Sequence, residues 1–397
     1  MPLTEEQKQI LKSTAPMFKE HGTEITSILY KHMFAAHPEL LDIFNQTNQK
    51  NGTQPFALAN TIFLVIENLD HLDILLPQIQ LISHKHRAST VLPKHYPIVG
   101  KYFLLAIDEF LGGTSDPNML NAWSTVYKMI ADIFIDIEKK LYSELGEQSE
   151  QGFLSFTIFK KEIIASGPIV AFTFERSDGK PLRQYHTGQY ITLRIKKDGH
   201  YHMRHYSLVQ PFDGKTYRIA IKQEFDHEPK GIVSTEMINH SKVGDIISIS
   251  LPAGSYMLMN NARDYLFIAG GIGITVLGSM ILDLHQQNKS DRITLIHCVI
   301  KEDQAAFADQ MRVILPENRF HLLVQSRHLL QGVIQQSIKP ETQVYLSGSV
   351  VFMNKSQEYL AQCKHPSTQI HIEAYQPSLS LVQNAVKNQF NTRSLTN

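Results

Sequence analysis

The spacing of hydrophobic residues changes twice along the chain. Up to about residue 145, hydrophobic positions recur three and four residues apart, as in segments 24–36, 55–69 and 119–142. This spacing is typical of helices that bury one face. Thr4 and Gln7 have the spacing of a capping box ahead of the first hydrophobic positions. Because no alternating pattern interrupts this part, it predicts an all-helical domain over residues 1–148.

From residue 153, hydrophobic and polar residues alternate in short runs. The runs cover residues 156–166, 190–197, 217–224 and 245–253, and turn-forming sequences rich in Gly, Asp and Pro separate them. A period of two residues is that of a strand with one buried face, and such turns join antiparallel neighbours. We therefore expect a small antiparallel barrel or sandwich over residues 149–260.

A third pattern begins near residue 264, where continuous hydrophobic runs alternate with helical segments. The runs lie at 265–271, 293–300, 319–326 and 342–349. Alternation of this kind predicts a parallel sheet with helices on both faces, and we assign it to residues 261–397. The tail, 378–397, has no acidic residue and is expected to be a loose end or a short surface helix.

Composition narrows the class of protein. The chain has 397 residues, which is too long for one core. Its 38 basic and 38 acidic residues balance, so no bulk charge favours nucleic acid or an anionic membrane. Two cysteines, Cys298 and Cys363, are too few for a disulfide framework or a four-cysteine metal site. With no secretory signal pattern at the N-terminus, a cytoplasmic location is the simplest expectation.

One uncharged stretch, residues 265–282, is long enough to imitate a membrane span. Three glycines interrupt it, at Gly270, Gly271 and Gly273. A strand, a tight turn and the start of a helix explain this pattern better, so no membrane span is predicted.

Three histidines lie close together in the helical part, at His84, His86 and His95. Positions two apart on a helix point about 200° away from each other, so His84 and His86 cannot face one cavity. His95 follows Pro93 and starts a new segment. At most one of the three can therefore be an inward ligand, and each of them taken alone is more often a surface residue.

The surrounding residues resemble those of the bacterial flavohaemoglobins. The similarity lies in the succession "ILYKHMFAAHPELLDIFN" at 28–45, "GTQPFALA" at 52–59 and "KHRASTVLPKHYPIVGKYF" at 85–103. It runs without long gaps from residue 1 to about residue 377. The resemblance implies an all-α globin domain, an antiparallel β-barrel FAD domain and an α/β parallel-sheet NAD(P) domain of the ferredoxin-reductase type.

The resemblance also assigns roles in the globin domain. It makes His86 the proximal ligand of haem iron, with Tyr96 and Glu138 behind it and Tyr30 and Gln54 over the gas-binding face. Imidazole is a good haem ligand, and an acceptor on its far nitrogen strengthens it as a donor to the metal. The resemblance thus selects His86, and His84 and His95 are expected to lie outside the pocket.

In the barrel, the sequence Arg204-x-Tyr206-Ser207 resembles a segment that binds FAD in ferredoxin-reductase-like proteins. The resemblance places Arg204 on the pyrophosphate, Tyr206 against the ring system and Ser207 at the redox-active edge. A guanidinium can form two hydrogen bonds with a phosphate, and a phenol ring offers a flat hydrophobic surface for the flavin ring system to pack on. Two further segments of the same resemblance are expected near the flavin, and their residues are Gln189, Tyr190, Gly231, Val233 and Ser234.

The segment 267–280 resembles the nicotinamide-binding turn of the same proteins, although it lacks the common dinucleotide fingerprint. Its expected cofactor-binding residues are Gly270, Gly271, Gly273 and Thr275, since glycines allow a dinucleotide to approach the backbone closely. Two departures from the family pattern lie nearby: Val276 replaces a proline, and Ser349 replaces a second proline after Ser347.

The segment "HIEAYQPS" at 371–378 resembles the end of the family's reductase module. There a glutamate and an aromatic ring lie against the flavin, which implies these roles for Glu373 and Tyr375. Gln376 stands where a glycine is usual, a third departure. Separately, Ser326 and Arg327 could hold the extra phosphate of NADPH, and an ordinary polar strand end explains them equally well.

The resemblance implies an NAD(P)H-dependent nitric oxide dioxygenase that converts nitric oxide and dioxygen to nitrate. Its cofactors are haem b, FAD and NADH or NADPH, and we expect a monomer with no nucleic-acid partner. An alternative is a haem-based gas or redox sensor whose reductase is impaired, because of the departures at Val276, Ser349 and Gln376. A third reading is a flavin reductase with a helical partner domain and no haem.

Overall fold

A computed structural model describes residues 3–44, 52–144, 152–223, 231–259 and 261–373. By their contacts, the residues form two compact units. One unit holds Met1–Gly152 together with Ile195–Met203, and the other holds Phe153–Arg194 and Arg204–Asn397. The domain boundaries expected from the sequence, near residues 148 and 260, stay a prediction.

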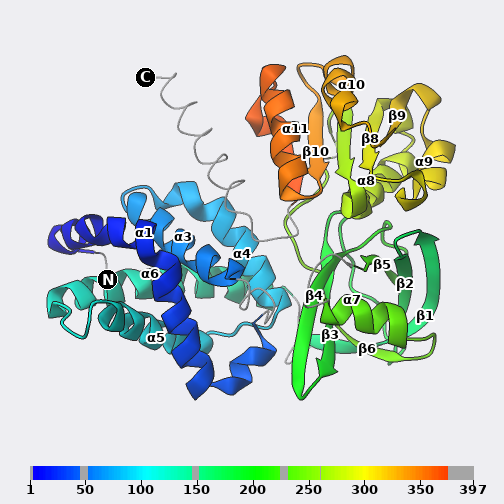
Figure 1. The fold of residues 1–397 in the computed structure, drawn as a ribbon. Coiled ribbons are helices and arrows are strands. Elements are labelled where there is room, and N and C mark those ends of the chain that lie inside the picture. The colour runs from blue at the N-terminus through cyan, green and yellow to red at the C-terminus, as the bar shows by residue number, and fades with distance from the viewer. Residues whose placement is uncertain (1–2, 45–51, 145–151, 224–230, 260, 374–397) are drawn as a thin grey trace. The chain divides into compact units, whose positions relative to one another are not determined.

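The first unit is helical, as its hydrophobic period predicts (Figure 1). Its helices are α1 (Glu5–Ala36), α3 (Thr53–Glu67), α4 (Leu76–Ala88), α5 (His95–Phe110) and α6 (Pro117–Ser143), with short turns η1 (Pro38–Asp42) and η2 (Leu72–Leu75). Thr4 caps α1 with the reciprocal Gln7 bond that the sequence predicts. Pro16 lies within α1 without ending it, and Pro38 opens η1.

The helical core is built around one aromatic side chain. Trp123 is fully buried, and its ring lies 4.4 Å from Phe18 and 5.8 Å from Phe103. Helices α1 and α3 approach closely at Gly22, where an added Cβ would lie 2.9 Å from the Ala59 side chain. This close approach matters for the site, because α1 and α3 carry Tyr30 and Gln54.

The antiparallel sheet lies mostly in the second unit, and its residues within Ile195–Met203 group with the first unit. Its strands are β1 (Phe153–Ala165), β2 (Ile169–Arg176), β3 (Tyr190–Lys197), β4 (His200–Ser207), β5 (Tyr217–Lys222) and β6 (Ile246–Ser250), in the order β4-β3-β6-β1-β2-β5. A bridge between Leu208 and Ile219 joins the two outer strands, so the sheet closes into a barrel rather than a sandwich. Strand β2 was not among the predicted runs, because its inner part is buried on both faces and does not alternate. A short helix, α7 (Ile232–Thr235), follows the barrel's fifth strand and continues as a π-helical turn, η4 (Glu236–His240).

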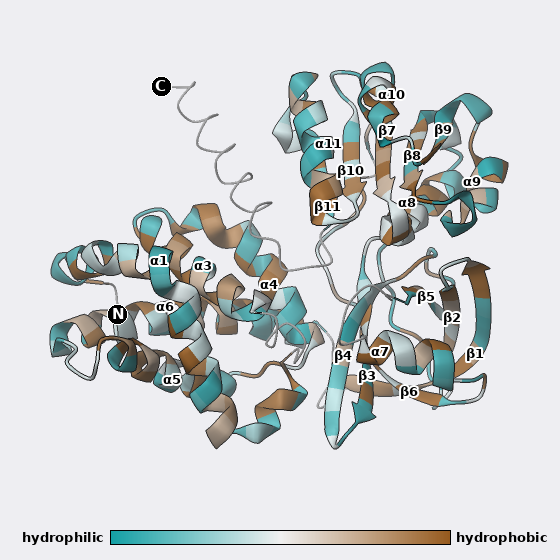
Figure 2. Cartoon of the chain, viewed as in Figure 1, coloured by the Kyte–Doolittle hydropathy of each residue, from teal (hydrophilic) through white to brown (hydrophobic). Residues whose placement is uncertain are grey.

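The parallel sheet lies in the same unit, in the order β11-β10-β7-β8-β9. Its elements are β7 (Tyr265–Gly270), α8 (Ile274–Gln286), β8 (Ile293–Val299), α9 (Ala308–Ile314), β9 (Phe320–Val324), α10 (Leu330–Ser337), β10 (Gln343–Ser347), α11 (Val350–Gln362) and β11 (Ile370–Glu373). One hydrophobic cluster joins the sheet to α8 and α9, and another joins it to α10 and α11. The strands of this sheet are hydrophobic, whereas helix α11 carries many hydrophilic residues (Figure 2).

Residues 265–282 form strand β7, a glycine turn and the start of α8, as expected. Within the part of the chain that the structure describes, no helix is long and apolar enough to cross a membrane. The predicted tail, 378–397, lies outside the described residues.

Candidate functional site

His86 of α4, Tyr96 of α5 and Glu138 of α6 meet near the C-terminal end of α4. His86 Nδ1 lies 2.8 Å from Glu138 Oε1 and 3.1 Å from the Tyr96 hydroxyl. The Tyr96 hydroxyl donates to the same Glu138 oxygen at 2.7 Å. The Glu138 side chain is 1% exposed, whereas that of His86 is 33% exposed. The structure therefore brings together the three residues that sequence reasoning placed on the proximal side.

This arrangement fixes the chemistry of the imidazole. A carboxylate only accepts hydrogen bonds, so a neutral His86 carries its proton on Nδ1 and leaves the Nε2 lone pair for a metal. Burial and the neighbouring Glu138 raise the pKa of Tyr96, so the phenol stays protonated and keeps donating. The donor set fits a histidine-bound haem iron, with Nε2 of His86 as the protein ligand.

Neighbouring bonds hold the segment between α4 and α5 in place. The Tyr142 hydroxyl donates to the Val91 carbonyl at 2.9 Å, and the Tyr127 hydroxyl donates to the Tyr96 carbonyl at 2.7 Å. Because Tyr127 packs on Gly100, where an added Cβ would lie 2.5 Å from its ring, α5 can approach α6 closely. Tyr142 and Tyr127 were not singled out from the sequence, since a tyrosine on an amphipathic helix gives no sign of which carbonyl it will meet.

The other two histidines have different surroundings. His84 is half-buried, and burial together with Arg87 lowers its pKa to about 4. His95 is buried, and its Nδ1 accepts a hydrogen bond from the Leu92 backbone N–H at 3.0 Å. His95, the first residue of α5, therefore stabilises the turn that leads into this helix.

Elsewhere in the globin unit, Tyr30 is 6% exposed and lies among aromatic rings. The Phe34 and Phe44 rings each lie 5.7 Å from that of Tyr30. Gln54 is half-buried in the first turn of α3. The buried Thr26 hydroxyl, one turn before Tyr30, donates to the Pro55 carbonyl at 2.8 Å. Thr26 thus ties the helix of Tyr30 to the residue after Gln54, a role the sequence did not indicate.

In the barrel, the predicted flavin residues fall on two adjoining segments. Leu208 N–H donates to the Gln189 carbonyl at 3.0 Å, which places Ser207 beside Gln189. The Gln189 amide bonds to the Gly254 carbonyl at 3.2 Å. Gly188 has φ +100, and an added Cβ there would lie 1.9 Å from the Tyr256 carbonyl oxygen. Only glycine fits this position, so the turn before Gln189 depends on it.

The two faces of strand β4 are used differently. Arg204 and Tyr206 share one face, whereas His205 on the other face bonds to the Thr192 hydroxyl at 2.8 Å. Arg204 is half-buried, and desolvation lowers the pKa of its guanidinium, a group that can form two hydrogen bonds with a phosphate. Tyr190 is 5% exposed and packs on His205. These surroundings suit a phosphate group at Arg204.

The third segment predicted to lie near the flavin begins at Gly231. The Ser234 hydroxyl donates to the Gly231 carbonyl at 3.0 Å, and the Val233 side chain is fully buried. Beyond it, Lys161 donates to the Ile238 and Ser241 carbonyls at 2.8 and 2.6 Å. Lys161 therefore provides hydrogen bonds to backbone carbonyls at the C-terminal end of this helical segment. The sequence did not reveal this role.

The glycine turn after β7 is shaped by close contacts. An added Cβ on Gly273 would lie 2.3 Å from the Ser347 carbonyl oxygen, and one on Gly270 would lie 2.6 Å from the Phe352 ring. Gly271 has φ +53, and the Thr275 hydroxyl donates to the Ile272 carbonyl at 2.9 Å. Gly270 and Gly273 therefore pack against protein atoms, whereas nothing lies within 4 Å of a Cβ added at Gly271, so the backbone of the turn is open at that residue.

The two described departures from the family pattern fit their helices. Val276 is fully buried in the first turn of α8, where a proline backbone would also be tolerated. Ser349 is the N-cap of α11, and its hydroxyl accepts from Phe352 N–H at 3.4 Å. Glu373 is buried at the end of β11, paired in register with Ser347. Tyr375 and Gln376 lie outside the described residues.

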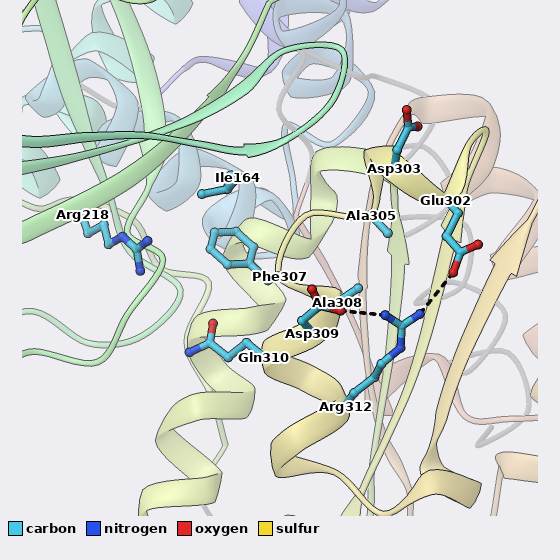
Figure 3. A pocket seen from close by; sticks show the side chains of 10 residues that line it. All are labelled: Ile164, Arg218, Glu302, Asp303, Ala305, Phe307, Ala308, Asp309, Gln310 and Arg312. Atoms are coloured by element: carbon cyan, nitrogen blue, oxygen red, sulfur yellow. Dashed lines mark hydrogen bonds and ion pairs between the residues drawn. The ribbon is translucent and has the colours of Figure 1, made fainter.

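A surface pocket of about 690 Å³ lies elsewhere in the second unit (Figure 3). Arg312 bonds there to Asp309 at 2.8 Å and to Glu302 at 3.4 Å. None of the residues predicted to bind cofactors lines this pocket. Arg312 is paired with two carboxylates and Arg218 with Glu162 outside the pocket lining, and we assign this pocket no part in the chemistry.

Comparison with known proteins agrees with this architecture. Residues 27–134 match the Globin family, and residues 140–257 match the Oxidoreductase FAD-binding domain family. The fold and site define a globin joined to an oxidoreductase module for FAD and a nicotinamide dinucleotide. The flavohemoprotein of Halalkalibacterium halodurans is 38% identical over 405 residues, covering 96% of this chain and 98% of that protein. That of Bacillus subtilis is 35% identical over 397 residues, covering 94% and 98%. The chain belongs to the flavohaemoprotein family, as its sequence motifs predict.

Solved structures share the fold. The crystal structure of a flavohemoglobin from Malassezia yamatoensis, with bound FAD and heme, has a TM-score of 0.82 at 24% identity and covers 94% of this chain and 99% of its own. Phthalate dioxygenase reductase has a TM-score of 0.50 at 26% identity, covering 57% of this chain and 68% of its own. The expected order of globin, barrel and parallel-sheet domains is confirmed.

Proposed function

We propose that this protein is an NAD(P)H-dependent nitric oxide dioxygenase that acts as a cytoplasmic monomer. Each nitric oxide and dioxygen would take up one electron to give nitrate, and each reduced nicotinamide would supply two such electrons. The observation that carries the proposal is the His86–Glu138–Tyr96 cluster in a chain that also contains the reductase module. When bound, FAD divides a hydride pair into single electrons and haem iron holds the gas.

The chain's own residues have separate tasks in this proposal. His86 would ligate the iron through Nε2, and the buried Glu138 carboxylate accepts a hydrogen bond from Nδ1–H. The hydrogen bond gives the imidazole anionic character, which favours activating dioxygen over storing it. Tyr30 and Gln54 offer donors on the gas-binding side, and the aromatic rings around Tyr30 exclude water. Arg204 holds the flavin pyrophosphate, and the turn at Gly270–Gly273 receives the nicotinamide dinucleotide.

The test is an anaerobic spectrum of the purified protein under carbon monoxide, followed by NADH or NADPH. We expect the flavin band to bleach and a ferrous carbonyl Soret band to appear. Nitric oxide and dioxygen are then supplied together, and nitrate should form in a one-to-one ratio with nitric oxide consumed.

A gas or redox sensor is the second candidate, favoured by the residues at Val276 and Ser349. This function predicts that dithionite reduces the haem, whereas NADH and NADPH do not. Rapid reduction by a nicotinamide without nitrate formation would contradict both functions, and would leave a reductase with another acceptor.

A further inference from the structure

One buried histidine of the parallel sheet contacts the glycine turn and has no part in the function proposed above. His297 lies in β8, fully buried on the same side of the sheet as Leu295 and helix α8. Its Nε2 lies 3.0 Å from the Gly271 carbonyl oxygen, although 26 residues separate the two in the chain. This bond connects the middle of one strand to the turn that leaves its neighbour, β7.

The partner atom determines which tautomer is present. A carbonyl oxygen only accepts, so Nε2 of His297 carries the hydrogen and Nδ1 is unprotonated. Burial lowers the pKa of His297 to about 4, so the ring is neutral near pH 7. Among the described residues, Nδ1 has no hydrogen-bond partner. A leucine would fill this hydrophobic place without leaving a buried nitrogen unpaired, so the Nε2–H bond is what a histidine adds here.

The bond orients one peptide of the turn. The Gly271 oxygen also accepts the Ile274 N–H at the start of α8, so two donors hold it. In a trans peptide the C=O of one residue and the N–H of the next point in opposite directions. Fixing the Gly271 C=O toward His297 therefore turns the Ile272 N–H away from the sheet core. Backbone N–H groups at such a turn are the usual donors to dinucleotide phosphates.

We propose that His297 is a positioning residue for the nicotinamide dinucleotide: its Nε2–H fixes the Gly271–Ile272 peptide in the orientation that binds the cofactor. The proposal requires only the dinucleotide-binding domain, and it is independent of whether nitric oxide is the substrate.

Three substitutions separate the donor from the volume of the ring. In His297→Gln the amide nitrogen reaches about as far as Nε2, in His297→Asn it does not, and His297→Leu has no donor. Binding of NAD⁺ and of NADP⁺ is measured by titration calorimetry on protein loaded with haem and FAD. We expect His297→Leu and His297→Asn to bind the preferred dinucleotide about tenfold more weakly, and His297→Gln to stay within about twofold.

A kinetic readout distinguishes positioning from catalysis. With ferricyanide as acceptor, the weak-binding variants should show a raised KM for the nicotinamide and a smaller change in kcat. His321→Gln is the matched control, since His321 is a half-buried histidine on the adjacent strand β9. Flavin and haem content should be the same in every variant.

Wild-type affinity in His297→Leu would overturn the proposal, and so would equal affinities of His297→Gln and His297→Asn. If His297→Leu does not fold, as judged by circular dichroism, the comparison of the two amide variants decides the question.

Discussion

Nδ1 of His86 and Oε1 of Glu138 lie 2.8 Å apart across 52 residues of sequence. Because the carboxylate is buried and accepts from Tyr96 as well, it acts on the histidine without being solvated. In the function proposed above, this relationship, more than the presence of a histidine, would distinguish the site from one that only stores a gas.

Replacing Glu138 with Gln should make His86 a weaker electron donor to the iron while leaving the hydrogen bond to Nδ1 in place. The amide oxygen still accepts from Nδ1, but the negative charge is gone. We expect haem to be retained, the iron–histidine stretching frequency in resonance Raman spectra to fall, and nitric oxide consumption to drop about 10- to 100-fold. Asp136→Asn, an exposed acid on the same helix, is the control. An unchanged stretching frequency would contradict the role of Glu138.

Tyr30→Phe should speed dioxygen release from the ferrous protein. The ring and its packing remain, whereas the hydroxyl that can donate to the bound gas is lost. A charge-assisted hydrogen bond of about 1.5–3 kcal/mol corresponds to an off-rate roughly 10- to 100-fold faster. Flash photolysis measures this rate, and Tyr102→Phe, another buried globin tyrosine, is the control. Equal dioxygen off-rates for Tyr30→Phe and wild type would contradict the proposal that the Tyr30 hydroxyl donates to the bound gas.

Arg204→Ala should yield protein that contains haem and little FAD. In the role proposed for it, the half-buried guanidinium neutralises a pyrophosphate, and alanine would leave that charge uncompensated. Flavin occupancy after purification is measured from the ratio of flavin to Soret absorbance. Arg218→Ala serves for comparison, since Arg218 lies in the same barrel and pairs with Glu162 at 3.3 Å. Full flavin occupancy in the Arg204 variant would mean that another group holds the pyrophosphate.

Val276→Pro tests whether the departure from the family pattern has a cost. A proline in the first turn of α8 restricts the unfolded chain and stabilises the fold by about 0.4–1 kcal/mol. If the valine is costly to the nicotinamide-binding turn, the proline should also raise the rate of hydride transfer. Stopped-flow bleaching of the flavin by NADH and NADPH gives the rate of hydride transfer. A faster rate would show that valine slows the native enzyme, and an unchanged rate would show that the turn accepts either residue.

The stability of the reductase unit should depend on pH through His297. Its pKa is about 4 in the folded state and 6.5 in its ordinary range, so the unfolded chain binds a proton in this interval and the folded chain does not. The free energy of unfolding should therefore fall as the pH is lowered from about 6.5 toward 4, by up to ~1.4 kcal/mol per pH unit. Urea unfolding followed by circular dichroism measures this slope. The slope should be smaller in His297→Gln, and equal slopes would indicate that other groups govern the dependence.

Much of the fold could be predicted from the sequence, because secondary structure follows local periodicity. The helical spacing before residue 145, the alternating runs and the hydrophobic strands after residue 264 all correspond to elements of the structure. Strands β2 and β11 were missed, since β2 is buried on both faces and β11 is only four residues long.

The sequence by itself determined which residue types could do the chemistry and in what order they occur. The succession of Tyr30, Gln54 and His86 and the glycine turn identify the family because they are carried by the chain directly. Only the tertiary structure decided which groups meet. The Thr26 bond to Pro55, the two bonds of Lys161 and the bond from His297 to Gly271 each join residues at least 26 positions apart. Such pairings depend on how helices and strands pack, and no local pattern encodes them.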